Sequence, residues 1–397
     1  MTDQFSRNFR GSKHQQLIQS LLDKLKQRGY IIHYSFFPKQ QRFGYTDKNP
    51  QFYFPFLITF EDGEQWVIQS TTTYPRERMN GYQWNAFHIK QIDPNIKKAY
   101  VIYPDAARED QVKSCIRYHQ DIENKAIISA LDGVISFADL YFLVEEKAFE
   151  RFGVGARKDR QGKAFEKLLV DILEHPANLE IWNGEGDKDL GFNYPWFKKI
   201  ISIYGAKAKE KLSFIEATDE IPDLPPKAGQ RRGGKPKTDI LVRLIFDSAP
   251  AETFTISSKR TSSDWVAIHQ YSADTYIDVL GIAEDELKSA LLELERVGAP
   301  TMIAPIYQQY ITEQLPNYYE RLAKWAYAGI GGEGDPATQM AEYFTIYKNE
   351  TKELEISHLD DYIARILTEV EGQLGSPFRF TYTGTRGTNI QLRGKIL

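Results

Sequence analysis

Three residues near position 250, Asp239, Ser257 and Lys259, have types and spacing that could do chemistry. On an extended strand, Ser257 and Lys259 share one face because side chains alternate with a period of two. Pairing their strand with the one before it places Asp239 opposite Lys259 or Arg260, so the three side chains converge at the open end of a hairpin. A carboxylate there can hold Mg2+, and a lysine beside it can polarise a water or stabilise charge on a scissile phosphate.

The elements that must position these residues are two strands and a turn. Residues 238–246 and 253–259 are rich in β-branched and aromatic side chains, and residues 247–252 between them contain Asp, Ser and Pro. We centre the hairpin between Ala249 and Pro250. An acid at a strand start, followed by acid-x-Lys on the partner strand, is the layout of the PD-(D/E)xK nucleases. The alternative is a surface hairpin with solvated polar residues, because the position before x-Lys is not acidic here.

Runs along the C-terminal part resemble one family in that superfamily, the MspI-type type II restriction endonucleases. Residues 233–239, which read GGKPKTD, resemble the stretch that holds the family's metal-binding aspartate. Residues 257–259, followed by 266–271, are similar to its Asn-x-Lys strand and the helix after it. Further matches follow the family's order and are residues 162–167 for an opening helix, 281–288 for a later helix start, and 380–382 and 390–393 for C-terminal strands. The resemblance covers about residues 157–397.

The resemblance implies a Mg2+-dependent nuclease that cuts double-stranded DNA and leaves 5′-phosphate ends. Asp239 would ligate Mg2+ and Lys259 would be the catalytic lysine. Ser257 stands where the family has asparagine, and a hydroxyl is a weaker metal ligand than a carboxylate. Glu166, on the opening helix, would supply a second carboxylate; the alternative is a solvated residue at the edge of that helix's apolar stripe. The other function class that stays open is a DNA-binding protein that kept the fold without catalysis.

The family reads DNA with side chains that enter the major groove, and its specificity is CCGG. Arginine to guanine and glutamine to base edges suit a G·C-rich site, so we expect CCGG or a related target. One groove contact of the family, a serine, is Ala267 here. The expected DNA-contacting residues are Thr381, Tyr382, Gln391 and Arg393 in the C-terminal hairpin, with Arg260 and Ser262 after the catalytic lysine.

A basic loop precedes Asp239. Residues 229–235 nearly spell a phosphate-binding loop, but Pro236 replaces the required Ser or Thr, and the segment leads into a strand instead of a helix. We therefore expect contact with DNA phosphates, and the alternative is a solvated loop. The cations of this loop are Lys227, Arg231, Arg232, Lys235 and Lys237.

Residues 1–150 are expected to form a separate N-terminal α/β domain. Strand-like segments at 53–60, 65–69 and 99–102 follow a helix, an order like that of the nuclease core. Phe56 falls where an acid would be needed, and Gln69-Ser70-Thr71 where acid-x-Lys would be, so no metal site can form. We hypothesise an inactive nuclease-like module that binds DNA; a scaffold or dimerisation domain is the alternative. The candidate contacts are Tyr74, Arg76, Arg78, Tyr82, Trp84, Lys90, Lys97 and Lys98.

Periodicity supplies the remaining elements. Apolar residues recur at helical spacing over residues 17–25, ending near Gly29, and over 165–173, 284–297 and 359–370. Ser357 and Asp360 stand where a capping pair would stand before the last helix. Residues 151–160 read as a linker to a catalytic and DNA-recognition domain at 151–397. The fold class is α/β (α+β), a restriction-endonuclease-like core with a mixed central sheet flanked by helices.

Composition bounds these expectations. The 397 residues carry a net charge of -4, which argues against a protein that coats nucleic acid, but residues 1–100 hold 14 Lys+Arg against 8 Asp+Glu. One cysteine excludes an internal disulfide, and no apolar run or signal peptide is visible, so a reducing cytoplasm is expected. The resemblance to restriction endonucleases implies that this cytoplasm is prokaryotic. The resemblance adds a companion DNA methyltransferase that acts on the same site and need not bind. No membrane partner is expected, and the protein would be a monomer or a homodimer.

Overall fold

The computed structural model describes residues 2–36, 52–107, 130–204, 210–225, 234–283, 285–382 and 387–397, together with residues 110, 112, 113, 116 and 119. The chain divides into two compact units. Unit 1 consists of Met1–Ala164 and Asp171–Lys198, and unit 2 of Phe165–Val170 and Lys199–Leu397. None of the described helices is long and apolar enough to cross a bilayer.

Unit 1 contains a five-stranded mixed sheet in the order β1-β2-β3-β4-β5. β1, β2 and β3 form an antiparallel meander, and β4 and β5 run parallel to β3. The turn between β2 and β3 uses Gly63, whose φ of 84° suits glycine. The three strands expected here are confirmed. The strands are β1 (His33–Phe36), β2 (Phe56–Thr59), β3 (Gln65–Ser70), β4 (Ile96–Tyr103) and β5 (Gly133–Ser136).

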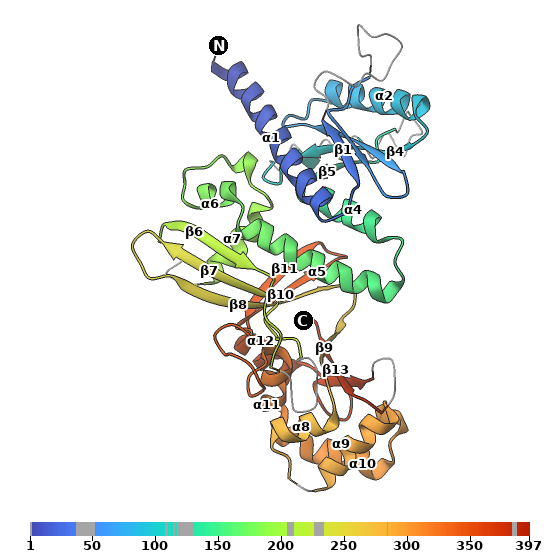
Figure 1. Cartoon of the computed structure of the whole chain (residues 1–397), viewed down its shortest axis with the longest axis vertical. Coiled ribbons are helices and arrows are strands. Elements are labelled where there is room, and N and C mark those ends of the chain that lie inside the picture. The colour runs from blue at the N-terminus through green and yellow to red at the C-terminus, as the bar shows by residue number, and fades with distance from the viewer. Residues whose placement is uncertain are drawn as a thin grey trace. The chain divides into compact units, whose positions relative to one another are not determined.

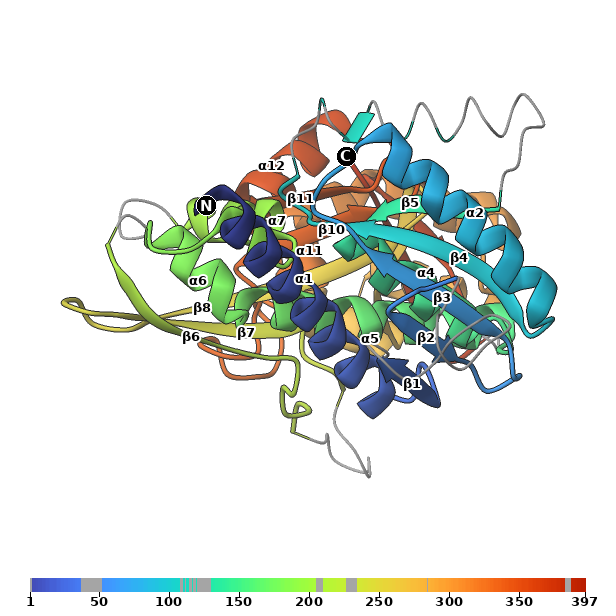
Figure 2. The same cartoon turned by 90° about the horizontal axis from the view of Figure 1, so that it is seen from above.

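Helices cover both faces of this sheet, α2 (Arg76–Ile92) on one and α1 (Thr2–Gln27) with α4 (Phe137–Phe149) on the other (Figure 1). Figure 2 shows α2 running alongside β4. Most of the apolar stripe of α1 is buried, as the spacing predicted: Ile18, Leu22 and Leu25 are at 0% exposure, and Leu17 at its start is half-buried. Amphipathic periodicity therefore decides which face of α1 meets the sheet.

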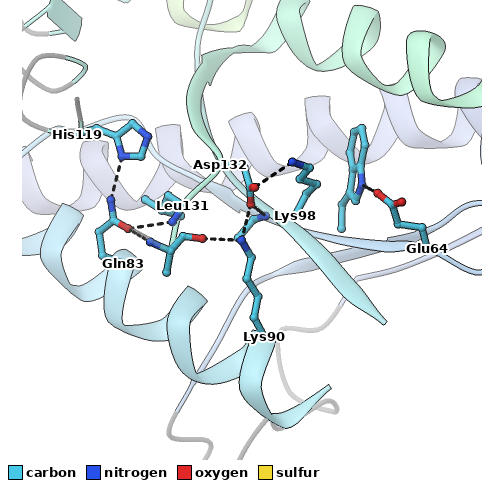
Figure 3. A network of polar contacts seen from close by, with 10 residues as sticks. Glu64, Gln83, Lys90, Lys98, His119, Leu131 and Asp132 are labelled. Atoms are coloured by element: carbon cyan, nitrogen blue, oxygen red, sulfur yellow. Dashed lines mark hydrogen bonds and ion pairs between the residues drawn. The ribbon is translucent and has the colours of Figure 1, made fainter. Parts of the chain in front are cut away.

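A polar network ties α2 to the segment before β5 (Figure 3). The amide oxygen of Gln83 accepts hydrogen bonds from the backbone N–H groups of Ala130 and Leu131, at 2.8 and 2.9 Å. Lys90 donates to the carbonyl of Ala130 and pairs with Asp132 at 2.6 Å, and Lys98 pairs with the same carboxylate at 3.2 Å. Two of the five cations expected to contact DNA from unit 1 are thus already paired within the unit.

The linker expected at residues 151–160 is wrong. Helix α5 (Val154–Leu173) begins inside it and continues without interruption through the apolar stripe. The segment after Gly153 contains no proline, and its Arg, Lys and Gln residues are good helix formers that extend the helix across the polar stretch despite Gly155 and Gly162. The elements that follow are α6 (Pro176–Trp182), the 3-10 turn η1 (Lys188–Leu190) and α7 (Tyr194–Ile203).

Unit 2 contains a second five-stranded sheet, in the order β11-β10-β8-β7-β6. β6, β7 and β8 are antiparallel neighbours, and β10 runs parallel to β8. Both expected strands of the hairpin near residue 250 are confirmed as β7 and β8. The strands are β6 (Leu212–Thr218), β7 (Ile240–Phe246), β8 (Glu252–Thr261), β10 (Tyr343–Lys348) and β11 (Glu353–His358).

A three-stranded sheet, in the order β12-β13-β9, lies in the same unit. β12 (Phe378–Thr381) and β13 (Ile390–Lys395) form the expected C-terminal hairpin, and β9 (Trp265–Tyr271) pairs antiparallel with β13. The helix expected over residues 266–271 is therefore wrong. The segment is too short and too rich in Val, Ile and aromatic residues for a stable helix, and pairing with β13 satisfies its backbone.

The helices of unit 2 form one apolar core with this sheet. α9 (Glu286–Val297) and α12 (Leu359–Glu369) confirm the two expected helices, but α12 is capped by the side chain of His358, whereas Ser357 lies in β11. The other helical segments are α8 (Ala273–Leu280), η3 (Pro300–Met302), α10 (Pro305–Gln314), η4 (Leu315–Tyr318), α11 (Tyr319–Ala323) and the π-helical turn η5 (Lys324–Ala328).

The two large sheets share a strand pattern. In each, three consecutive strands form an antiparallel meander and a fourth runs parallel to the third. They differ at the fifth strand, which is parallel in unit 1 (β5) and antiparallel in unit 2 (β11). An opening helix, α1 or α5, precedes the meander in both.

A buried histidine makes unit 1 sensitive to acid. His14 is 1% exposed, its Nδ1 lies 2.8 Å from Ser70 Oγ, and burial lowers its pKa to about 4. The unfolded chain binds a proton near the ordinary pKa of about 6.5, so between those values the unfolded state holds more protons than the folded state. Stability from His14 is therefore lost as the pH falls through this window.

We expect His14→Gln, which can still donate to Ser70, to be less stable than the wild type at pH 7.5. It should also lose less of its free energy of unfolding between pH 7.5 and 5, because the protonation term is removed. Urea unfolding of the full chain at both pH values measures this. His33→Gln at an exposed position is the control. An equal pH-dependent loss in His14→Gln and the wild type would contradict the assignment.

Candidate active site

Asp239 lies immediately before β7, beside the middle of β8. Its backbone N–H donates to the carbonyl of Ile256 at 2.8 Å, and Ile240 pairs with Ile256 in the ladder. Asp239 is therefore level with Ser257, and the expected pairing with Lys259 or Arg260 is wrong by two to three residues. The buried alternation of Ile240, Val242 and Leu244 excludes registers shifted by one residue, since such a slip would turn these side chains to the opposite face.

One carboxylate oxygen of Asp239 collects three donors. Oδ2 accepts from Ser257 Oγ at 3.1 Å, from the backbone N–H of Ser258 at 2.7 Å and from Lys259 Nζ at 3.3 Å. Among the described residues, none donates to Oδ1. The Lys259 ammonium also donates to the carbonyl of Ser258 at 2.7 Å. The structure thus brings Asp239, Ser257 and Lys259 together, with one carboxylate oxygen left for another ligand.

These residues line a cavity of about 440 Å³ that also includes side chains of the three-stranded sheet. Asp239 and Lys259 keep 23% and 29% of their side chains exposed there. Gln391 of β13 and Gln270 of β9 share its wall. A ligand in this cavity would therefore contact the carboxylate–lysine pair and the polar face of the sheet at once.

The donor set fits Mg2+ held by few protein ligands. In the part of the chain that the structure describes, Asp239 is the only acidic residue that lines the cavity, and no cluster of three or more His, Cys, Asp or Glu side chains occurs there. Mg2+ in phosphate-processing sites is commonly held by one or two carboxylates, with phosphate oxygens and water completing its shell. Oδ1 of Asp239 suits this role. Glu166 is half-buried on α5 and does not line the cavity, so its role as a second ligand stays a prediction.

The polar face of the three-stranded sheet carries most residues expected to read DNA. Thr381 and Gln391 are directly opposite each other in the β12–β13 ladder. Arg393 is on the same face, where its guanidinium donates to the carbonyl of Trp265 at 2.5 Å. Tyr382 follows β12 directly. Three of these positions therefore share one surface because residues paired across strands point to the same side.

Arg260 and Ser262 both form hydrogen bonds with the side chain of Asn349. Arg260 Nε donates to the side-chain oxygen of Asn349 at 2.8 Å, and the amide of Asn349 donates to Ser262 Oγ at 2.9 Å. This places both at the far end of β8, beyond Lys259. Their expected contact with DNA stays a prediction.

The basic loop is only partly described. Lys227, Arg231 and Arg232 lie outside the described residues. Lys235 is 83% exposed and pairs with Asp223 at 2.5 Å. The ammonium of Lys237, in contrast, donates to the carbonyl of Ile268, and burial together with the nearby Lys259 lowers its pKa to about 7. The ammonium of Lys237 is turned to the protein backbone, so the expected contact with a DNA phosphate would require it to leave this carbonyl.

The end of β9 belongs to the site, although its residues were not among those expected from the sequence. His269, Gln270 and Tyr271 line the cavity together with Asp239. A helix over residues 266–271, as expected, would not have placed them there. The β-branched and aromatic residues of this segment are the signal that identifies a strand.

Comparison with known proteins agrees with this geometry. The sequence model of the family described as restriction endonuclease MspI matches residues 141–394. The chain is 29% identical to the type II restriction enzyme BsuFI of Bacillus subtilis over 364 residues, covering 88% of each protein. It is 24% identical to the type II restriction enzyme MspI of Moraxella sp over 265 residues, which is 62% of this chain and 97% of that one.

The solved structure of MspI in complex with its cognate DNA shares the fold, with a TM-score of 0.52 and 20% identity, over 64% of this chain and 98% of that chain. The match with BsuFI covers so much of this chain that it must extend well into residues 1–140, which the family model does not reach. The family model spans more than half of the chain and includes every residue of the Asp239 site. The chain belongs to the MspI restriction endonuclease family, whose named members are type II restriction enzymes.

Proposed function

We propose that this chain is a Mg2+-dependent, sequence-specific endonuclease that hydrolyses double-stranded DNA at CCGG or a related G·C-rich site and leaves 5′-phosphate ends. The observation that carries the proposal is the Asp239–Lys259 pair, at 3.3 Å, in a cavity whose wall includes Gln391. The match of residues 141–394 to a family of restriction enzymes supports it. Because the carboxylate and the lysine lie beside the polar face of a sheet, one bound duplex could be hydrolysed at the first two and read at the third.

In this proposal Asp239 would hold the metal through its remaining carboxylate oxygen, Oδ1, because Oδ2 already accepts three hydrogen bonds. Bound Mg2+ supplies positive charge that stabilises the phosphorane-like transition state and favours ionisation of water. Lys259 orients the attacking water and stabilises negative charge on the scissile phosphate, and its hydrogen bond to the Ser258 carbonyl positions the ammonium. Ser257 orients the carboxylate and need not contact the metal.

In this proposal the side chains on the polar face of the three-stranded sheet read the bases. Gln391 and Arg393 contact base edges in the major groove, with Thr381 and Tyr382 beside them. Arg393 must exchange its hydrogen bond to the Trp265 carbonyl for one to guanine. The exposed Lys235, with Arg231, Arg232, Arg260 and Ser262, contacts the DNA backbone, which contributes affinity without sequence information.

The alternative function, a DNA-binding protein without catalysis, is motivated by Ser257 at a position that is acidic in most PD-(D/E)xK nucleases. The hydrogen bond of Ser257 to Asp239 argues against it, because a retained, oriented carboxylate–lysine pair has no evident use in binding alone. DNA that is bound with sequence preference but never cut in the presence of Mg2+ would favour this alternative.

For residues 1–150 we propose an inactive nuclease-like module. The first ladder pair of β2–β3, Phe56 with Ile68, corresponds to the first pair of β7–β8, Ile240 with Ile256. This correspondence sets Pro55, one residue before the expected Phe56, in the place of Asp239. It sets Gln69 and Thr71 in the places of Ser257 and Lys259, so neither the carboxylate nor the ammonium is retained. The exposed cations Arg76 and Arg78, near the start of α2, and Lys97, near the start of β4, contact DNA phosphates in this proposal.

We expect Asp239→Asn and Lys259→Met to lower the rate of DNA cleavage by about 10²–10³-fold or more, the scale of losing one electrostatic stabiliser of a transition state. The measurement is a single-turnover time course with Mg2+ and mapped product ends. Lys324→Met, which breaks only an exposed pair with Glu320, is the control. Cutting at the wild-type rate by either site variant would refute the assignment.

Two neighbouring lysines should behave differently. Lys237→Met leaves the Ile268 carbonyl without its donor, so we expect a loss of about 1–3 kcal/mol of unfolding free energy and an unchanged salt dependence of DNA binding. Lys235→Ala should cost about 0–1 kcal/mol because its ion pair is exposed, and should reduce the slope of log K against log salt by about 1. Urea unfolding and fluorescence anisotropy at several salt concentrations measure both. Interchanged results would reverse the two roles.

The DNA-binding role of the N-terminal module is tested in the full chain by a triple variant, Arg76→Ala, Arg78→Ala and Lys97→Ala. Removing one cation that neutralises a phosphate should reduce the slope of log K against log salt by about 0.9, and the affinity should fall accordingly. Lys26→Ala, at an exposed position of α1, is the control. Unchanged affinity and slope in the triple variant would favour a scaffold or dimerisation role.

A further inference from the structure

A bulge in β9 changes which of its side chains face outward. In the ladder with β13, Ala267 pairs with Arg393 and His269 pairs with Leu392, so Ile268 between them is the extra residue. Ile268 and His269 are both buried, at 8% and 4% exposure. A bulge of this kind re-aims the side chains that follow it. Simple alternation would have put His269 on the face of Ala267; the bulge turns His269 inward instead.

The side chain of His269 points from β9 into the aromatic core of the unit. Its ring centroid lies 3.9 Å from that of Trp325 in an edge-to-face arrangement and 5.7 Å from that of Tyr276. Burial and the nearby Lys237 lower its pKa well below the ordinary value, so the ring is a neutral part of the core. Because His269 points inward, its neighbour Gln270 points outward, and Gln270 is exposed.

Gln270 thereby joins a row of polar side chains across the sheet. It pairs directly with Gln391, which in turn pairs with Thr381 on β12. Directly opposite residues have Cβ atoms about 4.5–5.5 Å apart, so the two amides are side by side. Gln270 also lines the same cavity as Asp239 and Lys259. A DNA duplex whose phosphate reached Asp239 would therefore pass close to Gln270.

The other β9 side chains on this face are poorly suited to read bases. Trp265 is 8% exposed, and the guanidinium of Arg379 lies over its ring at 4.3 Å. Ala267 has no polar side-chain atom. Of these three outward positions on β9, only Gln270 combines exposure with a hydrogen-bonding side chain.

We propose that Gln270 is a specificity-determining residue that reads a base pair next to the one read by Gln391. This inference rests on the proposed endonuclease function. A glutamine amide offers both a donor and an acceptor, so it can donate to guanine O6 or N7, or accept from cytosine N4, in the major groove. Two amides on adjacent strands, roughly 4.8 Å apart, can address neighbouring base pairs, which are stacked about 3.4 Å apart.

The test uses the full-length protein and a set of duplexes. The wild-type site is first mapped by cleavage, and then each base pair of the site is replaced in turn by the other three. For every duplex, the cleavage rate and the metal-free affinity are measured for the wild type and for Gln270→Ala. At one base pair, we expect Gln270→Ala to lower the ratio of cleavage rates and affinities between the preferred and the substituted duplexes by about 5- to 150-fold, the value of one good base contact. At every other base pair this ratio should stay as in the wild type.

Two further variants make the result interpretable. Gln270→Glu keeps the size of the side chain and removes its N–H donors, so it should shift the preference at that same base pair. Gln309→Ala, on α10 where the amide bonds Glu313, should leave the whole profile unchanged. A wild-type profile for Gln270→Ala at every position would overturn the inference and leave the proposed function intact. A wild-type protein that neither cuts nor prefers any site would overturn both.

Discussion

The arrangement of this site depends on the convergence of three donors on a single oxygen of Asp239. Charge-assisted hydrogen bonds from Ser257, the Ser258 backbone and Lys259 are each stronger than neutral ones and together fix the carboxylate. Because one of the donors is a backbone N–H of β8, the site exists only in one register of β7 against β8. The alternating burial of β7 excludes the neighbouring registers, which are shifted by one residue. The packing of β7 in the core therefore also helps to fix the geometry of the Asp239 site.

The position of the three-stranded sheet depends on the close approach of β13 to the helical layer. At Gly394 of β13, a Cβ atom would collide with the buried ring of Tyr327 on η5. Glycine there lets β13 approach the helical layer, and the bulge in β9 adjusts the neighbouring strand to the same layer. This seating puts Leu392 on the core face of β13 and Gln391 on the opposite face, and Gln391 lines the cavity that holds Asp239. The residues proposed to read bases and the Asp239 site are therefore held in place by the same packed core.

The strands and helices with long, regular patterns were predictable from the sequence, as β7, β8 and the stripe of α5 illustrate. So was the convergence of Asp239, Ser257 and Lys259. The register of β7 against β8 was not predictable, because an apolar alternation with a period of two is equally compatible with a shift of two residues. The strand at 266–271 was missed for a related reason, since its partner β13 lies more than a hundred residues away along the chain.

The direction of a long side chain is a third kind of information that spacing cannot supply. Lys235 and Lys237 both belong to the basic loop, yet one pairs with an exposed carboxylate and the other with the backbone carbonyl of Ile268. The two sheets extend this argument to a whole module. β2 and β3 repeat the strand pattern of β7 and β8, but Pro55 has neither a carboxylate nor a backbone N–H, so it lacks two groups that Asp239 uses in its place. A strand pattern can thus be kept by buried apolar alternation after the polar residues at its edge have been replaced, which is why fold and chemistry must be argued from different residues.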